Sequence, residues 1–368
     1  MVSEITRKVL IVDDQADVLE ALRLLLKGKG YAAETALSPE QALTAAGAGA
    51  HDVVMIDMNY ARDTTSGAEG LALLDTLRAR RPDVPVIVMT AWSTIDLAVD
   101  AMRRGASDFI TKPWENDRVL EILEKQIGRS HELSIAQRVQ RRLLPPPQIS
   151  VPGIACECVF RPAGEIGGDL CDVFATGERS SALLLGDVSG KGTGAALLMA
   201  NLQATIRGVN DLAGSPVELI SRANRMFFES TTAEHYATLF FGAYDAEHRR
   251  LRYVNCGHPA PVLIRANGEI TRLEATGMVL GAFANADFEQ QELVLAEGDR
   301  LVLFSDGVSE ARQDEDDSWV VECLRMLSRA GSKVLAESLA MAAAISTDDV
   351  TVLDVRFLSE SKAVRQAT

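Results

Sequence analysis

The sequence has little cysteine, no long apolar run and no excess of positive charge. Its five cysteines all lie between Cys156 and Cys323, without a C-x-x-C pair. This spacing argues against a disulfide framework or a zinc site and predicts reduced thiols in a cytoplasmic protein. No apolar run approaches the ~20 residues of a membrane span, and the first residues do not resemble a signal peptide. We therefore expect neither membrane association nor secretion.

The charge balance is acidic, with 52 aspartates and glutamates against 37 lysines and arginines and a net charge of −15. Because nucleic-acid binding needs basic surface, we expect no nucleic-acid partner. The basic residues Arg138, Arg141 and Arg142 lie close together, and we expect them to face solvent on a helix. The length of 368 residues predicts two or three globular domains.

Residues 6–128 alternate between short apolar runs and amphipathic stretches. Runs such as Val9–Val12 and Val53–Ile56 predict buried strands of a parallel sheet, and Gly70–Arg80 predicts one of the helices between strands. Such units predict a doubly wound α/β domain, whose functional residues gather at the C-terminal ends of the strands. Polar residues follow the strands at those ends: Asp13, Asp14, Asp57, Thr90 and Lys112.

This set of strand-end residues resembles the receiver domain of response regulators. The resemblance implies that a sensor histidine kinase phosphorylates Asp57, and that Asp14 binds one Mg²⁺ directly and Asp13 binds it through water. It implies that the main-chain carbonyl of Asn59 is a further ligand. It also implies a set of phosphate-binding and switch residues, Thr90, Phe109 and Lys112. The loop 58–67 is longer than usual in the family, and its role is left open.

A helical linker is predicted over residues 129–147, ended by Pro145–Pro147. Apolar residues recur at helical spacing there, at Leu133, Ala136, Val139 and Leu143, and continue the pattern of Leu120, Leu123 and Ile127. Gly128 interrupts this pattern. Two structures fit it equally well: a parallel coiled coil that joins two copies into a homodimer, or a helix packed on one domain.

Residues 148–358 carry longer alternating strands, such as Ala182–Asp187 and Val350–Phe357, and two helices, at Ala195–Arg207 and Val217–Glu229. This pattern predicts an α/β sandwich of antiparallel sheets with flanking helices. Acidic residues recur in short contexts marked by glycine: Asp169, Asp172, Asp187, Asp306 and Asp349. Carboxylates on tight turns are the oxygen ligands that a pair of Mg²⁺ or Mn²⁺ ions prefers.

The order of these motifs resembles the metal-dependent PPM Ser/Thr phosphatases, in particular the SpoIIE-like branch that regulates sigma factors. Its landmarks include Gln140-x-x-Leu143-Leu144-Pro145, Gly167-Gly168-Asp169 and Ser305-Asp306-Gly307. The resemblance implies two Mn²⁺ or Mg²⁺ ions bridged by Asp187. It implies that Asp169 binds one ion, whereas Asp306 and Asp349 bind the other. It also implies that the Val188 carbonyl adds a contact to one of the two ions.

Five further residues near these motifs have open roles. Asp172 and Asp348 are expected to orient metal ligands. Lys191 either attracts the substrate phosphate or is an exposed turn residue. His258 either donates a proton to the leaving group or is a structural residue of its turn. Glu310 either positions water or caps the following helix.

Together the resemblances imply a two-component output protein, in which phosphorylation of Asp57 controls removal of phosphate from Ser or Thr of another protein. By analogy that protein is a phosphorylated anti-sigma-factor antagonist. The alternative is a non-catalytic adaptor, although degenerate relatives of that kind typically lose the carboxylates that this chain keeps. A DNA-binding regulator is disfavoured by the charge and by the lack of a recognition-helix module. Whether receiver phosphorylation activates or inhibits is left open.

Overall fold

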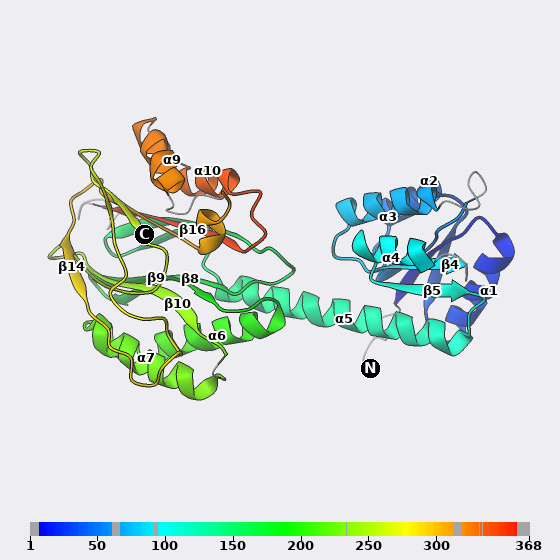
Figure 1. Ribbon diagram of the computed structural model, residues 1–368, viewed down its shortest axis with the longest axis horizontal. Helices are drawn as coiled ribbons and strands as arrows, with labels where there is room; N and C mark the ends of the chain where they lie inside the picture. The colour runs from blue at the N-terminus through cyan, green and yellow to red at the C-terminus, as the bar shows by residue number, and fades with distance from the viewer. Residues whose placement is uncertain are drawn as a thin grey trace. The chain divides into compact units, whose positions relative to one another are not determined.

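The computed structural model describes residues 7–60, 67–91, 95–232, 234–312, 318–330, 332 and 334–358 (Figure 1). The chain divides into two compact units, Met1–Ile135 and Ala136–Thr368. Residues 61–66, which make up most of the long loop after Asp57, lie outside the described residues. None of the helices in the described ranges combines the length and the apolarity that a bilayer crossing needs.

The first unit is a parallel five-stranded sheet in the order β2-β1-β3-β4-β5. Its strands are β1 (Lys8–Val12), β2 (Ala32–Ala36), β3 (Val53–Asp57), β4 (Val86–Ala91) and β5 (Asp108–Lys112). The connecting helices are α1 (Ala16–Lys27), α2 (Pro39–Ala48), α3 (Ala68–Arg80) and α4 (Ile95–Arg103), followed by α5 (Asn116–Leu143). The predicted doubly wound parallel domain is confirmed.

The central strands of this sheet are buried on both faces. On β1, Val9 and Ile11 pack with α1 and α5, whereas Leu10 and Val12 pack with α2 and α3. Because alternate side chains of a strand point to opposite faces, a strand covered on both faces is apolar throughout. The pairing of β1 with β3 places Asp13, after β1, close to Asp57 at the end of β3.

The second unit is a sandwich of two antiparallel sheets, in the orders β14-β11-β10-β9-β8 and β13-β12-β15-β16-β7-β6. The strands of the first sheet are β8 (Asp169–Gly177), β9 (Ser180–Val188), β10 (Ala237–Asp245), β11 (Arg250–Cys256) and β14 (Gln291–Val294). Those of the second are β6 (Gln148–Val151), β7 (Ile154–Arg161), β12 (Val262–Ile264), β13 (Ile270–Arg272), β15 (Arg300–Phe304) and β16 (Val350–Phe357). The predicted sandwich of antiparallel sheets is confirmed.

Helices cover both outer faces of the sandwich (Figure 1). On the five-stranded sheet lie α6 (Thr193–Gly208) and α7 (Pro216–Ser230), joined by the short helix η1 (Asn210–Leu212). On the six-stranded sheet lie α9 (Ser318–Arg329) and α10 (Leu335–Ala342), and the short α8 (Asp306–Ser309) follows β15. A third apolar core fills the space between the sheets, where Leu183 and Leu185 of β9 meet Leu353 of β16.

The linker is part of one continuous helix, α5, which passes through Gly128 without a break. Its first turns bury Val119, Leu123 and Ile127 in the first unit. Further along, Val139 is 53% exposed, and Leu133 is half-buried. An exposed apolar side chain at a predicted seam position is compatible with a partner helix, and the homodimer stays a prediction.

Candidate functional site

Three carboxylates meet at the C-terminal edge of the parallel sheet. Asp13 and Asp57 are buried and Asp14 is half-buried, and one oxygen from each lies within 4.8 Å of the others. The Lys112 ammonium lies 2.6 Å from Asp13 Oδ2 and 2.8 Å from Asp57 Oδ1. Three acidic groups therefore share one base, and we refer to this cluster as the receiver pocket.

The receiver pocket has the donor chemistry for one Mg²⁺. Burial raises the pKa of Asp57, and the hydrogen bond from Lys112 only partly offsets this. Burial opposes the charge of Lys112, but its hydrogen bonds with Asp13 and Asp57 raise the pKa overall. Asp14 Oδ1 is buried without a hydrogen-bond partner. An unpaired oxygen beside excess negative charge suits a hard divalent cation, which Asp13, Asp14 and Asp57 would hold.

The other predicted receiver residues lie around this pocket. The Asn59 main-chain N–H donates to Asp57 Oδ2 at 3.3 Å. Thr90 is buried near the end of β4, and Phe109 on β5 is 42% exposed. Tyr60 was not predicted: it is buried, its hydroxyl has no hydrogen-bond partner, and burial with the charges of Asp57 and Asp13 raises its pKa. The only sign of Tyr60 in the sequence was its position three residues after Asp57, the predicted phosphorylation site.

The second acidic cluster lies between the two sheets of the sandwich. Asp169 on β8 and Asp187 on β9 are directly opposite each other across an antiparallel pair. Opposite residues of such a pair share a face, so both side chains belong to the same surface of the sheet. Asp306 follows β15 and Asp349 precedes β16. We call these four carboxylates the Asp187 cluster.

Glycines and main-chain hydrogen bonds hold these turns close together. A side chain at Gly168 would meet the Val188 carbonyl and Asp187, and one at Gly307 would meet the main chain of Asp349. Asp349 accepts hydrogen bonds from the N–H groups of Ala163 and Gly168, both at 2.7 Å. The approach of the turns therefore depends on the absence of a Cβ at these two glycines.

The Asp187 cluster carries negative charge that no base in the cluster balances. Burial, together with the charges of Asp306, Asp348 and Asp349, raises the pKa of Asp187 to about 7. Burial and the charge of Asp187 raise the pKa of Asp169 well above its ordinary value. Asp169 Oδ1 is buried without a hydrogen-bond partner. This donor set fits hard divalent cations, which Asp169, Asp187, Asp306 and Asp349 would hold.

The two acidic clusters differ in compactness. In the described part of the chain, only the receiver pocket brings three ligand atoms within 4.8 Å of one another. In the Asp187 cluster, Asp349 is bound by main-chain N–H groups, and Asp169 Oδ2 accepts a hydrogen bond from the Thr351 hydroxyl. The carboxylates of the Asp187 cluster are close enough to raise one another's pKa, but they are less closely grouped than those of the receiver pocket.

Comparison with known families agrees with this geometry. The family model for the response regulator receiver domain matches residues 9–124, and the model for stage II sporulation protein E (SpoIIE) matches residues 177–358. The chain joins a receiver domain to a SpoIIE-type phosphatase domain. The SpoIIE match contains Asp187, Asp306 and Asp349 and begins after Asp169.

Similar proteins match one domain or the other. Over 202 residues the chain is 28% identical to phosphoserine phosphatase RsbU of Bacillus subtilis, which covers 55% of this chain and 59% of the relative. Over 124 residues it is 35% identical to transcriptional regulatory protein ZraR of Salmonella typhimurium, which covers 34% of this chain and 27% of the relative. The chain thus spans less than two thirds of either relative.

A solved structure shows the fold of the second domain. The SiaA-PP2C domain of Pseudomonas aeruginosa superposes with a TM-score of 0.53 at 20% identity. The match covers 64% of this chain and 98% of that domain. The SpoIIE-type domain therefore has the PP2C fold.

Asp172 and Asp169 lie on opposite faces of β8. Arg207 of α6 donates two hydrogen bonds to Asp172, each 2.7 Å long, and Gln203 donates a third at 3.0 Å. Asp172 is buried and bound to α6, away from the inner face that carries Asp169. Its contacts position the helix on the sheet.

Lys191 and Asp348 form a pair at the rim of the Asp187 cluster. The Lys191 ammonium is 2.9 Å from Asp348 Oδ2, and its side chain is 66% exposed. Glu310 is exposed and is the C-cap residue of α8. Lys191 is therefore an exposed, positively charged group at this rim, and the roles of Lys191 and Glu310 stay predictions.

His258 is buried in the second domain rather than open to a substrate. Its Nδ1 lies 2.9 Å from the Thr238 hydroxyl, and its main-chain N–H donates to Asn255 Oδ1 at 2.9 Å. Burial lowers its pKa to about 3, so the ring is neutral at pH 7. These contacts support the structural role over the proton donor.

Gln140 was quoted above only as a landmark, but it directly contacts the turn that carries Asp169. Its side-chain amide donates to the Gly167 carbonyl at 2.7 Å and accepts from the Gly167 N–H at 3.2 Å. Gln203 of α6 donates to the carbonyl of Leu143, the last residue of α5, at 2.8 Å. The end of α5 is thus bound to both the Asp169 turn and α6.

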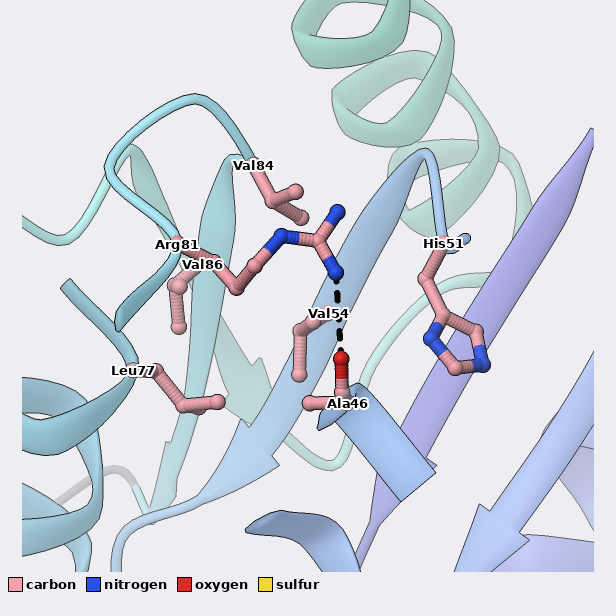
Figure 2. Close-up of a pocket in the computed structure, with 7 residues that line it drawn as sticks. All are labelled: Ala46, His51, Val54, Leu77, Arg81, Val84 and Val86. Carbon is pink, nitrogen blue, oxygen red and sulfur yellow. Dashed lines mark hydrogen bonds between the residues drawn. The ribbon is translucent and has the colours of Figure 1, made fainter. Parts of the chain in front are cut away.

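A small cavity in the receiver domain lies at the other end of β3 (Figure 2). Its volume is about 10 Å³, and Arg81 at its wall donates to the Ala46 carbonyl at 3.0 Å. His51, before β3, lines it, whereas Asp57 lies at the end of that strand. Such a volume holds about one water molecule, so we assign it no ligand.

Proposed function

We propose that this protein is a response regulator whose output is metal-dependent dephosphorylation of a phosphoserine or phosphothreonine protein. We further propose that the substrate is a phosphorylated anti-sigma-factor antagonist and that a sensor histidine kinase phosphorylates Asp57. The Asp187 cluster carries this proposal, because its excess negative charge lies in a domain of the SpoIIE family. The printed name of RsbU, a phosphoserine phosphatase, supports the same reaction class.

The residues of the Asp187 cluster have distinct parts in this proposal. Asp187 would hold both of two Mn²⁺ or Mg²⁺ ions, Asp169 would hold one of them, and Asp306 and Asp349 would hold the other. The Val188 carbonyl would add a contact to one of the two ions. When bound, such ions offset phosphoryl charge and acidify water. Thr351 fixes the orientation of Asp169 through its hydroxyl, and Ser305 donates to the Asp349 carbonyl at 3.0 Å. The protein therefore presents its carboxylates on turns that are already ordered.

We propose that the receiver domain controls the output through the charge of its pocket. A phosphoryl group on Asp57 adds up to two negative charges and new hydrogen-bond acceptors. Lys112 already lies 2.8 Å from Asp57 and would pair with the added group. Thr90 and the partly exposed Phe109 are the residues we expect to change position. We propose that this change reaches the phosphatase domain through α5, in a homodimer.

The test is release of phosphate from a serine-phosphorylated antagonist protein in the presence of Mn²⁺. We expect Asp187→Asn to lower the rate roughly a hundredfold or more, because one residue serves both ions. Asp211→Asn is the matched control, since Asp211 is exposed and lies in η1. Tight binding of the phosphoprotein by the wild type without any turnover would support the adaptor instead.

A further inference from the structure

Two cysteine side chains face each other across the core of the phosphatase domain. Cys158 lies on β7 of the six-stranded sheet, and Cys171 lies on β8 of the five-stranded sheet. Both are buried among the apolar residues between the sheets, and their sulfur atoms are 3.1 Å apart. Neither side chain has been given a role in the proposed reaction.

This separation is short for two thiols that only pack together. A disulfide bond is about 2.05 Å long, so the sulfur atoms need to approach by only about 1 Å. The bond would add a covalent link between two sheets that otherwise meet through side-chain packing and hydrogen bonds, such as that from Thr351 to Asp169. It would also close a short loop, residues 158–171, which contains the Gly167-Gly168-Asp169 turn.

We propose that Cys158 and Cys171 are a redox-modifiable pair that forms a disulfide on exposure to a peroxide. The Cys158 thiol, the less buried of the two, loses its proton, and the thiolate attacks hydrogen peroxide, breaks its O–O bond and becomes a sulfenic acid. The hydroxide that leaves takes up the thiol proton and becomes water. The second thiol displaces the hydroxyl of that sulfenic acid as a second water. Two S–H bonds are lost, one S–S bond forms, and the two electrons reduce one peroxide to two waters.

The disulfide affects the Asp187 cluster through β8. Cys171 lies two residues after Asp169 on the same face of this strand, and Asp169 is directly opposite Asp187. Movement of Cys171 toward β7 therefore shifts the strand segment that positions Asp169. We expect the oxidised protein to melt at a higher temperature and to dephosphorylate its substrate severalfold more slowly. The effect on turnover rests on the proposed function, whereas bond formation does not.

Peptide mapping of the full-length wild-type protein tests bond formation directly. A protease that cleaves after glutamate separates the three neighbouring cysteines, because Glu157 lies between Cys156 and Cys158 and Glu165 lies before Cys171. After treatment with hydrogen peroxide, we expect peptides 158–165 and 166–178 to be covalently joined and to separate again with dithiothreitol. Failure to find this joined pair, or its replacement by a Cys156–Cys171 bond, would overturn the proposal.

Variants separate the local bond from general oxidation. Cys158→Ala and Cys171→Ala should each abolish the peroxide-induced rise in melting temperature, whereas Cys256→Ala, which removes a buried cysteine of β11, should retain it. If the joined peptides form and melting rises while turnover is absent in both redox states, the proposed function fails and the redox pair stands. If turnover is present and no joined peptides form, the redox pair fails and the proposed function stands.

Discussion

At the scale of single residues, Asp187 is held in a setting that disfavours its own charge. Its pKa is raised to about 7 because it is partly buried beside Asp306, Asp348 and Asp349. In the unfolded chain the same group has a pKa near 3.8. Its ionisation therefore weakens the metal-free fold as the pH rises from about 4 to 7, and cations that bind there restore stability.

Asp187→Asn should therefore stabilise the metal-free protein at pH 7. The variant removes the cost of burying this charge and its repulsion by the neighbouring carboxylates, on the order of 2 kcal/mol in total, which corresponds to a rise in Tm of about 5 °C. The same variant should lose the stabilisation that Mn²⁺ gives to the wild type. Calorimetry with and without Mn²⁺ measures both effects, with Asp211→Asn as control. A variant that melts lower without metal and still responds to Mn²⁺ would contradict the metal-centre assignment.

His258 predicts a loss of stability in acid. Its folded pKa of about 3 is below the ordinary value of 6.5, so the unfolded state binds the proton more readily as the pH falls below 6.5. Between pH 7 and pH 5 this costs about 2 kcal/mol of unfolding free energy. Denaturant unfolding at several pH values measures this effect. We expect the unfolding free energy of the wild type to fall more steeply from pH 7 to pH 5 than that of His258→Gln.

If the unfolding free energy of the two proteins fell equally with pH, His258 would be accessible to protons in the folded state. Because Asp187 and Asp169 have raised pKa values, their protonation acts in the opposite direction over part of this range. The difference between the wild type and the variant, rather than either curve alone, isolates His258.

At the residue scale, it was easier to predict which residues are acidic site candidates than to predict which side chains they contact. The acidic and glycine-marked positions were visible in the sequence, and the structure brings Asp169, Asp187 and Asp349 together. Asp172 looked similar, but its partner Arg207 is 35 residues away on α6. The sequence did not predict β8 as a strand, and without that strand the opposite faces of Asp169 and Asp172 were not apparent.

At the scale of elements, hydrogen bonds connect the end of α5 to both the Asp169 turn and α6. The buried side chain of Gln140 forms hydrogen bonds with both the N–H and the carbonyl of Gly167. Leu143 and Gln203 connect the same helix end to α6. A displacement of α5 therefore acts on the Asp169 turn through hydrogen bonds rather than through loose packing.

Gln140→Ala should lower the free energy of unfolding of the phosphatase domain by about 3 kcal/mol. Two buried main-chain groups lose their partner, and each unsatisfied group costs about 1–3 kcal/mol. Arg141→Ala, at an exposed position of the same turn, should change stability by less than about 0.5 kcal/mol. Urea unfolding followed by circular dichroism measures both, and equal effects of the two variants would exclude a stabilising role for the Gln140–Gly167 hydrogen bonds.

Elements with a strong apolar pattern were predicted well. Val53–Ile56 became β3, and Val217–Glu229 became α7 with one further residue at each end. The helices α2, α9 and α10 were missed, and so was β2, which has only one buried residue. Packing against the rest of the domain stabilises such elements, and a short stretch of sequence does not reveal that packing.

At the scale of the whole molecule, two acidic pockets with the same preference for hard cations lie in two separate domains. The receiver pocket is a compact set with a lysine, and the Asp187 cluster is larger and has its base, Lys191, only at the rim. In the proposed function, one pocket holds a transferred phosphoryl group and the other hydrolyses a phosphoester. We propose that their union in one chain is the basis for regulated dephosphorylation.

The most direct test is the Mn²⁺-dependent rate of phosphate release from a serine-phosphorylated antagonist protein, before and after treatment with a small acyl phosphate. We expect this treatment to change the wild-type rate by about fivefold or more, because phosphorylation of Asp57 is proposed to control the phosphatase domain. Asp57→Asn should show no change, while the exposed Asp83→Asn should behave like the wild type. Measurable turnover that is identical with and without the acyl phosphate would contradict receiver control of the phosphatase.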